Sequence, residues 1–413
     1  MYDIVVIGGG AAGMLASSVA AGQGAKVLLL EQNDRLGKKL GITGKGRCNV
    51  TNDCTVPEVL SNIPTGGRFL HSAMNGFTPR DTMMFFESLG VPLKTERGNR
   101  VFPESDKASD IVNALRRSIE KTGVINKKRR ALGVKTESGR VSEVLTEEGA
   151  IGCKAAILAT GGLSYSETGS TGDGYRMARA LGHTVTPLRG SLTPLEAQPE
   201  LCSRMQGLTL KNVKLSVFDG GKKPVYEDLG ELLLTHFGLS GPLILTASAH
   251  MRDFNGRYYH INIDLKPGLD EKKLDLRILR DFEKYRNRDF TNALGDLLNR
   301  LMIPVIVERS GIYPEAKVNS ITREQRLGLV RLIKAFRIDI DRPRPVEEAI
   351  VTSGGVATKE INPKTMESKI VPGLFFAGEI IDADAYTGGF NLQIAWSSAF
   401  AAAKAAAKKA TEF

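Results

Sequence analysis

The sequence is poor in cysteine, tryptophan and histidine, and it has no long hydrophobic run. Its 413 residues include four cysteines, one tryptophan and five histidines. So few cysteines give neither a disulfide framework nor paired zinc spacings, so we expect a reduced, cytoplasmic protein without structural metal. No apolar run reaches the roughly 18–20 residues that span a bilayer, and residues 1–3 lead into an expected strand rather than a signal peptide. We therefore expect no membrane association.

The composition is that of a globular protein with an excess of positive charge. An apolar fraction of 42% with 25% charged residues excludes wholesale disorder. The length exceeds what one hydrophobic core usually serves, so several domains are expected. The net charge is +10, and 26 basic residues face 20 acidic ones between Pro187 and Pro345. This excess favours anionic partners such as nucleotides, nucleic acid or acidic metabolites.

The first forty residues carry the most informative motif. Residues 2–7 are a β-branched apolar run, which is typical of a parallel strand buried on both faces. The turn at residues 8–13 reads Gly-Gly-Gly-Ala-Ala-Gly and matches G-x-G-x-x-G. A helix is expected over residues 11–21 and a second strand over residues 26–30. Strand, glycine turn, helix and strand in this order predict a dinucleotide site.

Each part of this motif has a physical purpose. Gly8 permits the tight turn, Gly10 lets a pyrophosphate approach the backbone, and Gly13 allows close packing of helix and sheet. The helix N-terminus offers unpaired amides to the phosphates. Glu31 ends the second strand and can accept hydrogen bonds from the adenosine ribose. A carboxylate there disfavours a 2′-phosphate, so the site suits FAD or NAD rather than NADP.

Three later segments favour FAD over NAD. Residues 35–49 combine glycines with basic side chains that can meet phosphates, although a solvated basic loop is the alternative. Residues 155–162 read as a buried strand ending in Ala-Thr-Gly-Gly, beside which a flat cofactor can pass. Residues 373–379 read as a strand ending in Gly-Glu, and residues 388–393 open a helix whose N-terminus can stabilise negative charge on a reduced flavin. A nicotinamide enzyme does not need this last segment.

These motifs resemble the BaiN-like (YhiN-like) family of bacterial NAD(P)/FAD-dependent oxidoreductases, whose core is similar to that of fumarate-reductase-type and glutathione-reductase-type flavoproteins. The resemblance lies in residues 8–13, 41–49, 159–174, 233–242 and 378–393, and it spans essentially the whole chain. It implies an α/β fold with a discontinuous Rossmann-like FAD-binding domain and two insertions. We expect the FAD domain at 1–187 and 346–413, an antiparallel, barrel-like β domain at 188–268, and a helical domain at 269–345.

The cofactor contacts follow from the same comparison of motifs. From the glycine turn and the end of the second strand we expect Gly8, Gly10, Ala11, Ala12, Gly13, Glu31 and Gln32. From the basic loop we expect Lys38, Lys39, Gly44, Gly46, Arg47, Cys48 and Asn49. From the middle of the chain we expect Ala159, Thr160, Gly161, Gly162 and Asp173, with the backbone of Val134 at the adenine. From the C-terminal motif we expect Gly378, Glu379, Gly389, Phe390, Asn391 and Leu392. Asp173 equally fits a helix cap.

Three residues are candidates for chemistry. His236 lies between an apolar run and a Gly-rich turn, so it can serve as a proton donor facing the flavin or be a structural histidine at a domain junction. Cys48 follows Arg47, which can lower the pKa of the thiol. No second cysteine has disulfide-reductase spacing, since Cys54 lies six residues on, so contact with the flavin by packing is favoured. Arg47 is a candidate anion clamp, and the other histidines show no metal-ligand spacing.

The sequence favours a reductase that passes hydride from NAD(P)H through FAD to an activated C=C bond. Because no second nucleotide-binding motif is present, NAD(P)H is expected as a transient donor. The alternatives are an amine or amino-ketone oxidase that uses O₂, a flavoenzyme that reduces RNA bases with the help of the basic insertion, and a non-catalytic redox sensor. The substrate is a small molecule or RNA, and the oligomeric state stays open.

Overall fold

The computed structural model describes residues 1–254 and 256–411, and the chain forms two compact units. Unit 1 comprises Met1–Ser191 and Val346–Phe413, and unit 2 comprises Leu192–Pro345. Each unit has its own hydrophobic core. The second unit is thus an insertion in the first, and the fold combines a Rossmann-like parallel sheet with an antiparallel insertion, as predicted.

The main sheet of unit 1 is largely parallel and runs in the order β6-β2-β1-β9-β8-β7, with β19 also paired to β9. Ile4, Val5 and Val6 on the central strand β1 are all fully buried, because helices and loops cover both faces of the sheet. The strands of this sheet are β1 (Tyr2–Ile7), β2 (Val27–Glu31), β6 (Ile125–Lys128), β7 (Ala131–Glu137), β8 (Arg140–Thr146), β9 (Gly149–Leu158) and β19 (Leu374–Phe376).

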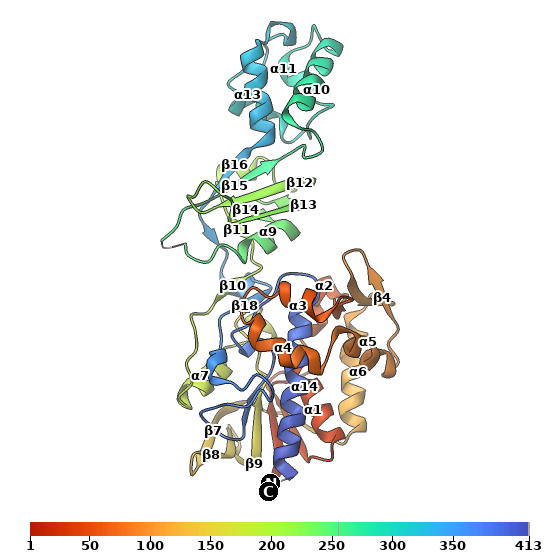
Figure 1. Ribbon diagram of the computed structural model, residues 1–413, viewed down its shortest axis with the longest axis vertical. Coiled ribbons are helices and arrows are strands. Elements are labelled where there is room, and N and C mark those ends of the chain that lie inside the picture. The colour runs from red at the N-terminus through yellow and green to blue at the C-terminus, as the bar shows by residue number, and fades with distance from the viewer. Residues whose placement is uncertain (255, 412–413) are drawn as a thin grey trace. The chain divides into compact units, whose positions relative to one another are not determined.

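Two helices from opposite ends of the sequence pack side by side against this sheet. Figure 1 shows α1 (Ala11–Gly22) next to α14 (Phe390–Thr411). The buried face of α14 is rich in alanine, which lets the helix approach its neighbours closely. Trp396 is fully buried, and its indole Nε1 donates to the carbonyl of Val50 at 2.9 Å. The C-terminal motif is therefore fixed against the N-terminal one.

Smaller elements complete unit 1. The helices are η1 (Leu40–Ile42), α2 (Thr43–Gly46), α3 (Val56–Ser61), α4 (Gly67–Gly76), α5 (Pro79–Ser88), α6 (Ala108–Lys121), η2 (Ser166–Thr168), α7 (Asp173–Ala180), η4 (Val346–Glu348), η5 (Thr358–Glu360) and η6 (Gly378–Ile380). The strands are β3 (Thr51–Asn52), β4 (Leu93–Glu96), β5 (Arg100–Pro103), β10 (Arg189–Ser191) and β18 (Val351–Ser353). Strands β3, β5 and β4 form a separate antiparallel sheet.

Unit 2 is built on an antiparallel sheet in the order β16-β15-β12-β13-β14-β11-β17. Its strands are β11 (Leu195–Glu196), β12 (Thr209–Phe218), β13 (Tyr226–Leu234), β14 (Gly238–Ser240), β15 (Tyr259–Asp264), β16 (Phe336–Ile340) and β17 (Arg342–Pro343). Its helices are α8 (Pro199–Ser203), α9 (Pro242–Ser248), α10 (Glu271–Lys284), α11 (Phe290–Ala293), α12 (Ile303–Ser310), η3 (Val318–Ser320) and α13 (Arg323–Lys334).

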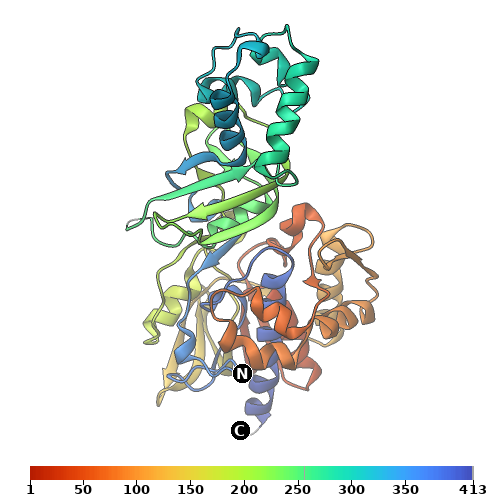
Figure 2. The same cartoon turned by 45° about the horizontal axis from the view of Figure 1, so that its top comes forward.

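The sheet and the helices of unit 2 share one core. Val213, Leu215 and Val217 of β12 alternate with half-exposed residues, and the apolar faces of α10 and α13 join the same cluster. Figure 2 shows these helices packed beside the strands within the unit. The stretch 269–345, expected to be helical, ends in β16 and β17, where Phe336, Ile338 and Ile340 alternate with polar residues.

The two chain crossings between the units are neighbours in a small sheet. β10 pairs with β18 in antiparallel fashion, with Arg189 opposite Ser353 and Ser191 opposite Val351. The buried carboxylate of Asp384 accepts hydrogen bonds from the hydroxyls of Ser191 and Ser353, both at 2.9 Å. The loop before α14 is thus tied to both crossings. Within the described residues, no helix has both the length and the apolarity required to cross a membrane.

Candidate functional site

The glycine turn between β1 and α1 is shaped by close packing at two positions and by open space at a third. A Cβ on Gly13 would lie 1.7 Å from the carbonyl oxygen of Gly8. A Cβ on Gly8, whose φ is +105°, would lie 2.5 Å from the carbonyl oxygen of Ala159. No atom lies within 4 Å of a Cβ on Gly10. Open space therefore faces the N-terminus of α1, where a pyrophosphate can meet backbone amides.

Glu31 lies at the end of β2 beside this turn. Its Oε2 accepts a hydrogen bond from the amide of Gly9 at 2.7 Å. Its Oε1 accepts from the amide of Asn33 at 2.8 Å and from Asn33 Nδ2 at 2.7 Å. The carboxylate is thus held in one orientation at the place where a dinucleotide site presents its ribose acceptor.

A second carboxylate, Glu379, organises the other end of the site. Its Oε2 pairs with Lys39 Nζ at 2.7 Å, and its Oε1 accepts from Ser164 Oγ at 3.0 Å and from the amide of Thr352 at 2.8 Å. Gly162 passes so close that a Cβ would lie 2.3 Å from Thr352 Oγ1. Ser164 and Thr352 were not predicted as site residues. Only Ser164 could have been found from the sequence, because it closely follows the Ala-Thr-Gly-Gly turn.

Close backbone contacts bring the four predicted segments together. A Cβ on Gly378 would lie 2.9 Å from Ala12 Cβ, so the C-terminal strand end meets the start of α1. A Cβ on Gly389, whose φ is +97°, would lie 2.4 Å from the carbonyl oxygen of Thr51, so the start of α14 meets β3. The glycine turn meets Ala159 in the same way. Segments far apart in the sequence therefore form one site in unit 1.

Two polar atoms at this site have no partner among the described residues. They are Asn49 Oδ1 and Thr160 Oγ1, and both are buried. A buried polar atom without a hydrogen bond costs free energy, so such atoms usually face a water or a ligand. Together with the open space at Gly10 and the carboxylates of Glu31 and Glu379, they provide what a flavin dinucleotide requires. The residues present fit FAD.

Several residues that were predicted to contact the cofactor have side chains that form hydrogen bonds within the protein. Gln32 Nε2 donates to the carbonyl of Gly169 at 2.7 Å, and Lys38 Nζ donates to the carbonyl of Glu167 at 2.8 Å. Asn391 Oδ1 accepts from the amide of Ala385 at 2.9 Å, so this side chain holds the turn before α14. Ala11 begins α1, Phe390 is buried, Leu392 is half-buried, and Gly44 and Gly46 lie exposed around α2.

Asp173 and Val134 lie on neighbouring elements. Asp173 begins α7, and Arg130 holds its carboxylate through Nε at 2.8 Å. Burial opposes the ionisation of Asp173, but hydrogen bonds from Arg130 and Thr171 and the charge of Arg176 lower its pKa overall. The residue thus has a structural role at the helix start. Val134 lies on β7, opposite Val144 of β8.

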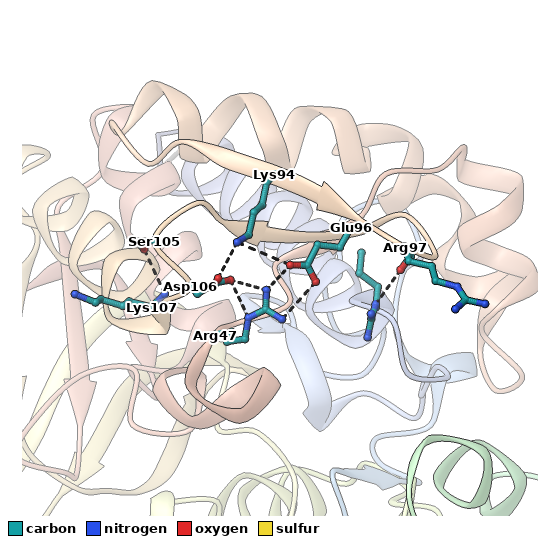
Figure 3. A network of polar contacts seen from close by, with 8 residues as sticks. Arg47, Lys94, Glu96, Arg97, Ser105, Asp106 and Lys107 are labelled. Atoms are coloured by element: carbon teal, nitrogen blue, oxygen red, sulfur yellow. Dashed lines mark hydrogen bonds and ion pairs between the residues drawn. The ribbon is translucent and has the colours of Figure 1, made fainter. Parts of the chain in front are cut away.

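Arg47 has partners other than the expected anion. Its Nε donates to Asp106 at 2.8 Å, its Nη2 contacts Glu96, and its guanidinium lies 4.1 Å from the ring centre of Phe102. Lys94 also contacts both carboxylates, so the four side chains form one exposed network (Figure 3). Hydrogen bonds to Glu96 and Asp106 raise the pKa of Arg47. The guanidinium therefore fixes the loop through Glu96 and Asp106, and its role as an anion clamp stays a prediction.

The expectation of a lowered pKa at Cys48 is wrong. The side chain is fully buried, and this burial raises the pKa of the thiol to about 12. The charge of Arg47 has no such effect because the guanidinium points to Glu96 and Asp106. A neutral, inaccessible thiol is not a nucleophile. Cys48 is thus a packing residue, and its contact with the flavin stays a prediction.

His236 lies in unit 2, in the turn between β13 and β14. Its side chain is exposed, and its ring meets that of Phe237 edge to face at 5.1 Å. Thr235 and Gly238 close the turn through a backbone hydrogen bond of 2.8 Å. The role of His236 as a proton donor stays a prediction.

A Ser-His-Glu row that the sequence did not reveal lies in unit 1. His183 Nε2 is 2.9 Å from Ser368 Oγ, and Nδ1 is 3.3 Å from Glu360 Oε2. Ser368 Oγ also accepts from the amides of Ile370 and Val371, and His183 and Ser368 are buried. Burial lowers the pKa of His183. Because solvent and substrate cannot reach the serine, this row stabilises the fold and is no hydrolytic site.

The fold and the site define an FAD-dependent oxidoreductase. The chain belongs to the family described as HI0933-like protein Rossmann domain, whose model matches residues 2–405. This is the family that the motifs resemble. In the part of the chain that the structure describes, no group of histidine, cysteine and carboxylate residues could hold a metal ion.

Two curated relatives cover nearly the whole chain. The chain is 29% identical to a 3-dehydro-bile acid delta(4,6)-reductase from Clostridium scindens, over 99% of this chain and 100% of the relative. It is 32% identical to a ribosomal RNA dihydrouridine synthase from Escherichia coli, over 98% of this chain and 97% of the relative.

Among solved structures, a 3-ketosteroid-delta4-(5alpha)-dehydrogenase from Rhodococcus jostii has a TM-score of 0.50 with 16% identity, covering 97% of this chain and 96% of that chain. The Sdh1 complex of Mycobacterium smegmatis has a TM-score of 0.51 with 15% identity, covering 100% and 69%. These structures share the fold.

Proposed function

We propose that this enzyme saturates a C=C bond conjugated to a carbonyl group, and that its substrate is uracil in ribosomal RNA. The observation that carries the proposal is the pair of curated relatives, which match over almost their full lengths. One is named for a delta(4,6)-reductase of a 3-dehydro-bile acid, and the other for the synthesis of dihydrouridine in ribosomal RNA. Both names describe the addition of two hydrogens to a C=C bond near a carbonyl.

The chemistry of that reaction requires a hydride and a proton. When bound, FAD would supply the hydride for the carbon β to the carbonyl, and NAD(P)H would be the source of that hydride, with NAD(P)⁺ as the oxidised product. The proton goes to the neighbouring carbon, and His236 is the proposed donor. Glu379, held by Lys39, Ser164 and Thr352, positions the ribityl chain. The N-terminus of α14 favours the negative charge that a reduced flavin carries.

RNA is favoured over a small enone for two reasons. A third curated relative, from Haemophilus influenzae, is also named a ribosomal RNA dihydrouridine synthase and is 29% identical over 97% of this chain. In addition, unit 2 carries 25 basic and 20 acidic residues, a surplus that favours a polyanion. Such a substrate is met in the cytoplasm. The bile-acid relative makes a planar 3-oxo-delta(4) compound the second candidate.

Anaerobic stopped-flow spectroscopy tests the proposal. The holoenzyme is reduced with NADH or NADPH and then mixed with unmodified ribosomal RNA, with a 3-oxo-delta(4) steroid, or with buffer. We expect RNA to reoxidise the flavin fastest, and mass spectrometry to find dihydrouridine in the product. Reoxidation by the steroid and not by RNA would support the second candidate instead. Flavin that neither nicotinamide nucleotide reduces would overturn NAD(P)H as the donor.

A further inference from the structure

A short segment of unit 1 is fastened across the cofactor site by four side chains from one stretch of sequence. We call residues 164–169 the strap. These four side chains all lie within residues 32–39, directly after the ribose acceptor Glu31. The four hydrogen bonds are Gln32 Nε2 to Gly169 O (2.7 Å), Asn33 Nδ2 to Thr168 O (2.9 Å), Lys38 Nζ to Glu167 O (2.8 Å) and Lys39 Nζ to Ser164 Oγ (2.8 Å). The first end of the strap has further anchors, since the amide of Ser164 donates to Thr352 Oγ1 and the amide of Tyr165 donates to the carbonyl of Glu347, both at 3.1 Å.

The ends of the strap coincide with the ends of the dinucleotide site. At one end, Ser164 donates to Glu379, the acceptor expected at the ribityl chain. At the other end, Thr168 and Gly169 accept from Asn33 and Gln32, and Asn33 also donates to Glu31 at the adenosine ribose. One end of the strap therefore lies at the expected ribose acceptor and the other at the expected ribityl acceptor.

The backbone around the strap is built to pivot. Gly161 and Gly162 precede it, and Gly169 and Gly172 have φ values of +104° and +79°. Tyr165 has a φ of +53°, which is uncommon for a residue with a side chain, and it is 38% exposed. Three of the four acceptors are the backbone carbonyls of residues 167–169, so this end of the strap can detach by losing hydrogen bonds while the buried Ser164 stays anchored to Thr352 and Glu379.

We propose that the strap is a clasp that controls the uptake and release of FAD. With the four hydrogen bonds formed, it closes over the nucleotide between Glu31 and Glu379, and it opens for the cofactor to exchange. Gln32 and Lys38 then retain FAD by holding the strap, and their side chains need not touch a phosphate. This inference concerns the cofactor alone and stands whether or not RNA is the substrate.

The rates of FAD release and uptake test the clasp directly. The holoenzyme is diluted into excess apoflavodoxin or another FAD acceptor, and the flavin fluorescence reports release. For the double variant Gln32→Ala/Lys38→Met we expect release to accelerate about tenfold, since two hydrogen bonds close the strap. Uptake by the apoprotein should accelerate by a similar factor, so the equilibrium affinity changes little. The control is Arg80→Met, which removes an exposed cation of α5 that is not among the strap's hydrogen-bond partners and should leave both rates unchanged.

A second test changes the strap itself rather than the side chains that hold it. In Gly169→Ala the new Cβ would lie 2.4 Å from Asn33 Nδ2 at a φ of +104°, so the strap end is forced away. We expect both FAD rates to rise again, with the melting temperature of the apoprotein measured alongside to confirm folding. Faster release with unchanged uptake would identify Gln32 and Lys38 as direct FAD ligands and overturn the clasp. Unchanged release in the folded variants would overturn it as well.

Discussion

Two glycine-rich segments of the cofactor site differ in what determines their structure. In the turn at residues 8–13, Gly8 and Gly13 are required because the backbone of a neighbouring residue fills the space of a Cβ. In the basic segment at residues 38–49, the side chains of Lys38, Lys39 and Arg47 bind partners from distant parts of the chain. The clash at Gly13 is with Gly8 of the same motif and is therefore visible in the sequence, whereas the clash at Gly8 with Ala159 and the partners of the cations depend on the folded structure.

The largest expected effect separates two glycines of the first segment. Gly13→Ala places a Cβ 1.7 Å from the carbonyl oxygen of Gly8, so we expect a loss of about 3 kcal/mol in the free energy of unfolding. Gly10→Ala meets no atom within 4 Å, so the protein should stay folded and lose affinity for FAD. Denaturant unfolding of the apoprotein and FAD titration measure the two effects. Equal destabilisation by both substitutions would contradict a packing role for Gly13 and a cofactor-binding role for Gly10.

The second prediction concerns Cys48, at the end of the basic segment. Because burial raises the pKa of this thiol to about 12, the folded state retains a proton that the unfolded state releases above about pH 9. Its contribution to stability is therefore complete below pH 9 and declines as the pH rises towards 12. Relative to Cys48→Ala, we expect the wild type to lose about 1–3 kcal/mol between pH 8 and pH 11.

The control for this effect is the corresponding alanine variant at Cys54, which is only half-buried and should show a smaller change with pH. Unfolding curves at several pH values provide the measurement. A stability difference between the wild type and Cys48→Ala that is constant from pH 8 to pH 11 would contradict a protonated, buried thiol.

The smallest expected effect is at Arg47. In Arg47→Met the exposed network with Glu96 and Asp106 is lost, so we expect a small decrease in melting temperature that largely disappears at about 1 M salt. Glu96→Gln/Asp106→Asn should have a similar effect, since it removes the other side of the network. Normal stability of Arg47→Met together with loss of FAD would support the anion clamp and contradict the structural role.

The sequence predicted the fold and the backbone of the site better than it predicted the side-chain contacts. The strand, glycine turn and helix at residues 2–21 follow from local pattern, and so does the strand that ends at Glu31. The convergence of residues 8–13, 159–162 and 378–393 followed from resemblance, because no local pattern shows which strands are neighbours. Cys48 was misjudged because its pKa depends on burial, which the adjacent arginine does not reveal.

The partners of Glu379 show the same limit. The motif Gly-Glu marked the carboxylate, but Ser164, whose hydroxyl binds it, lies on the other side of the inserted unit in the sequence. Likewise, the row formed by His183, Ser368 and Glu360 joins residues that no spacing rule relates. Such contacts require the three-dimensional arrangement of the strands.

The pairing of β10 with β18 has a consequence for how proteins of this kind change over time. Because the chain leaves the flavin-binding unit at Ser191 and returns at Val346 through two hydrogen-bonded neighbours, a short peptide can connect these positions. The inserted unit can thus be lengthened, replaced or deleted in a gene without disturbing the framework that carries the cofactor.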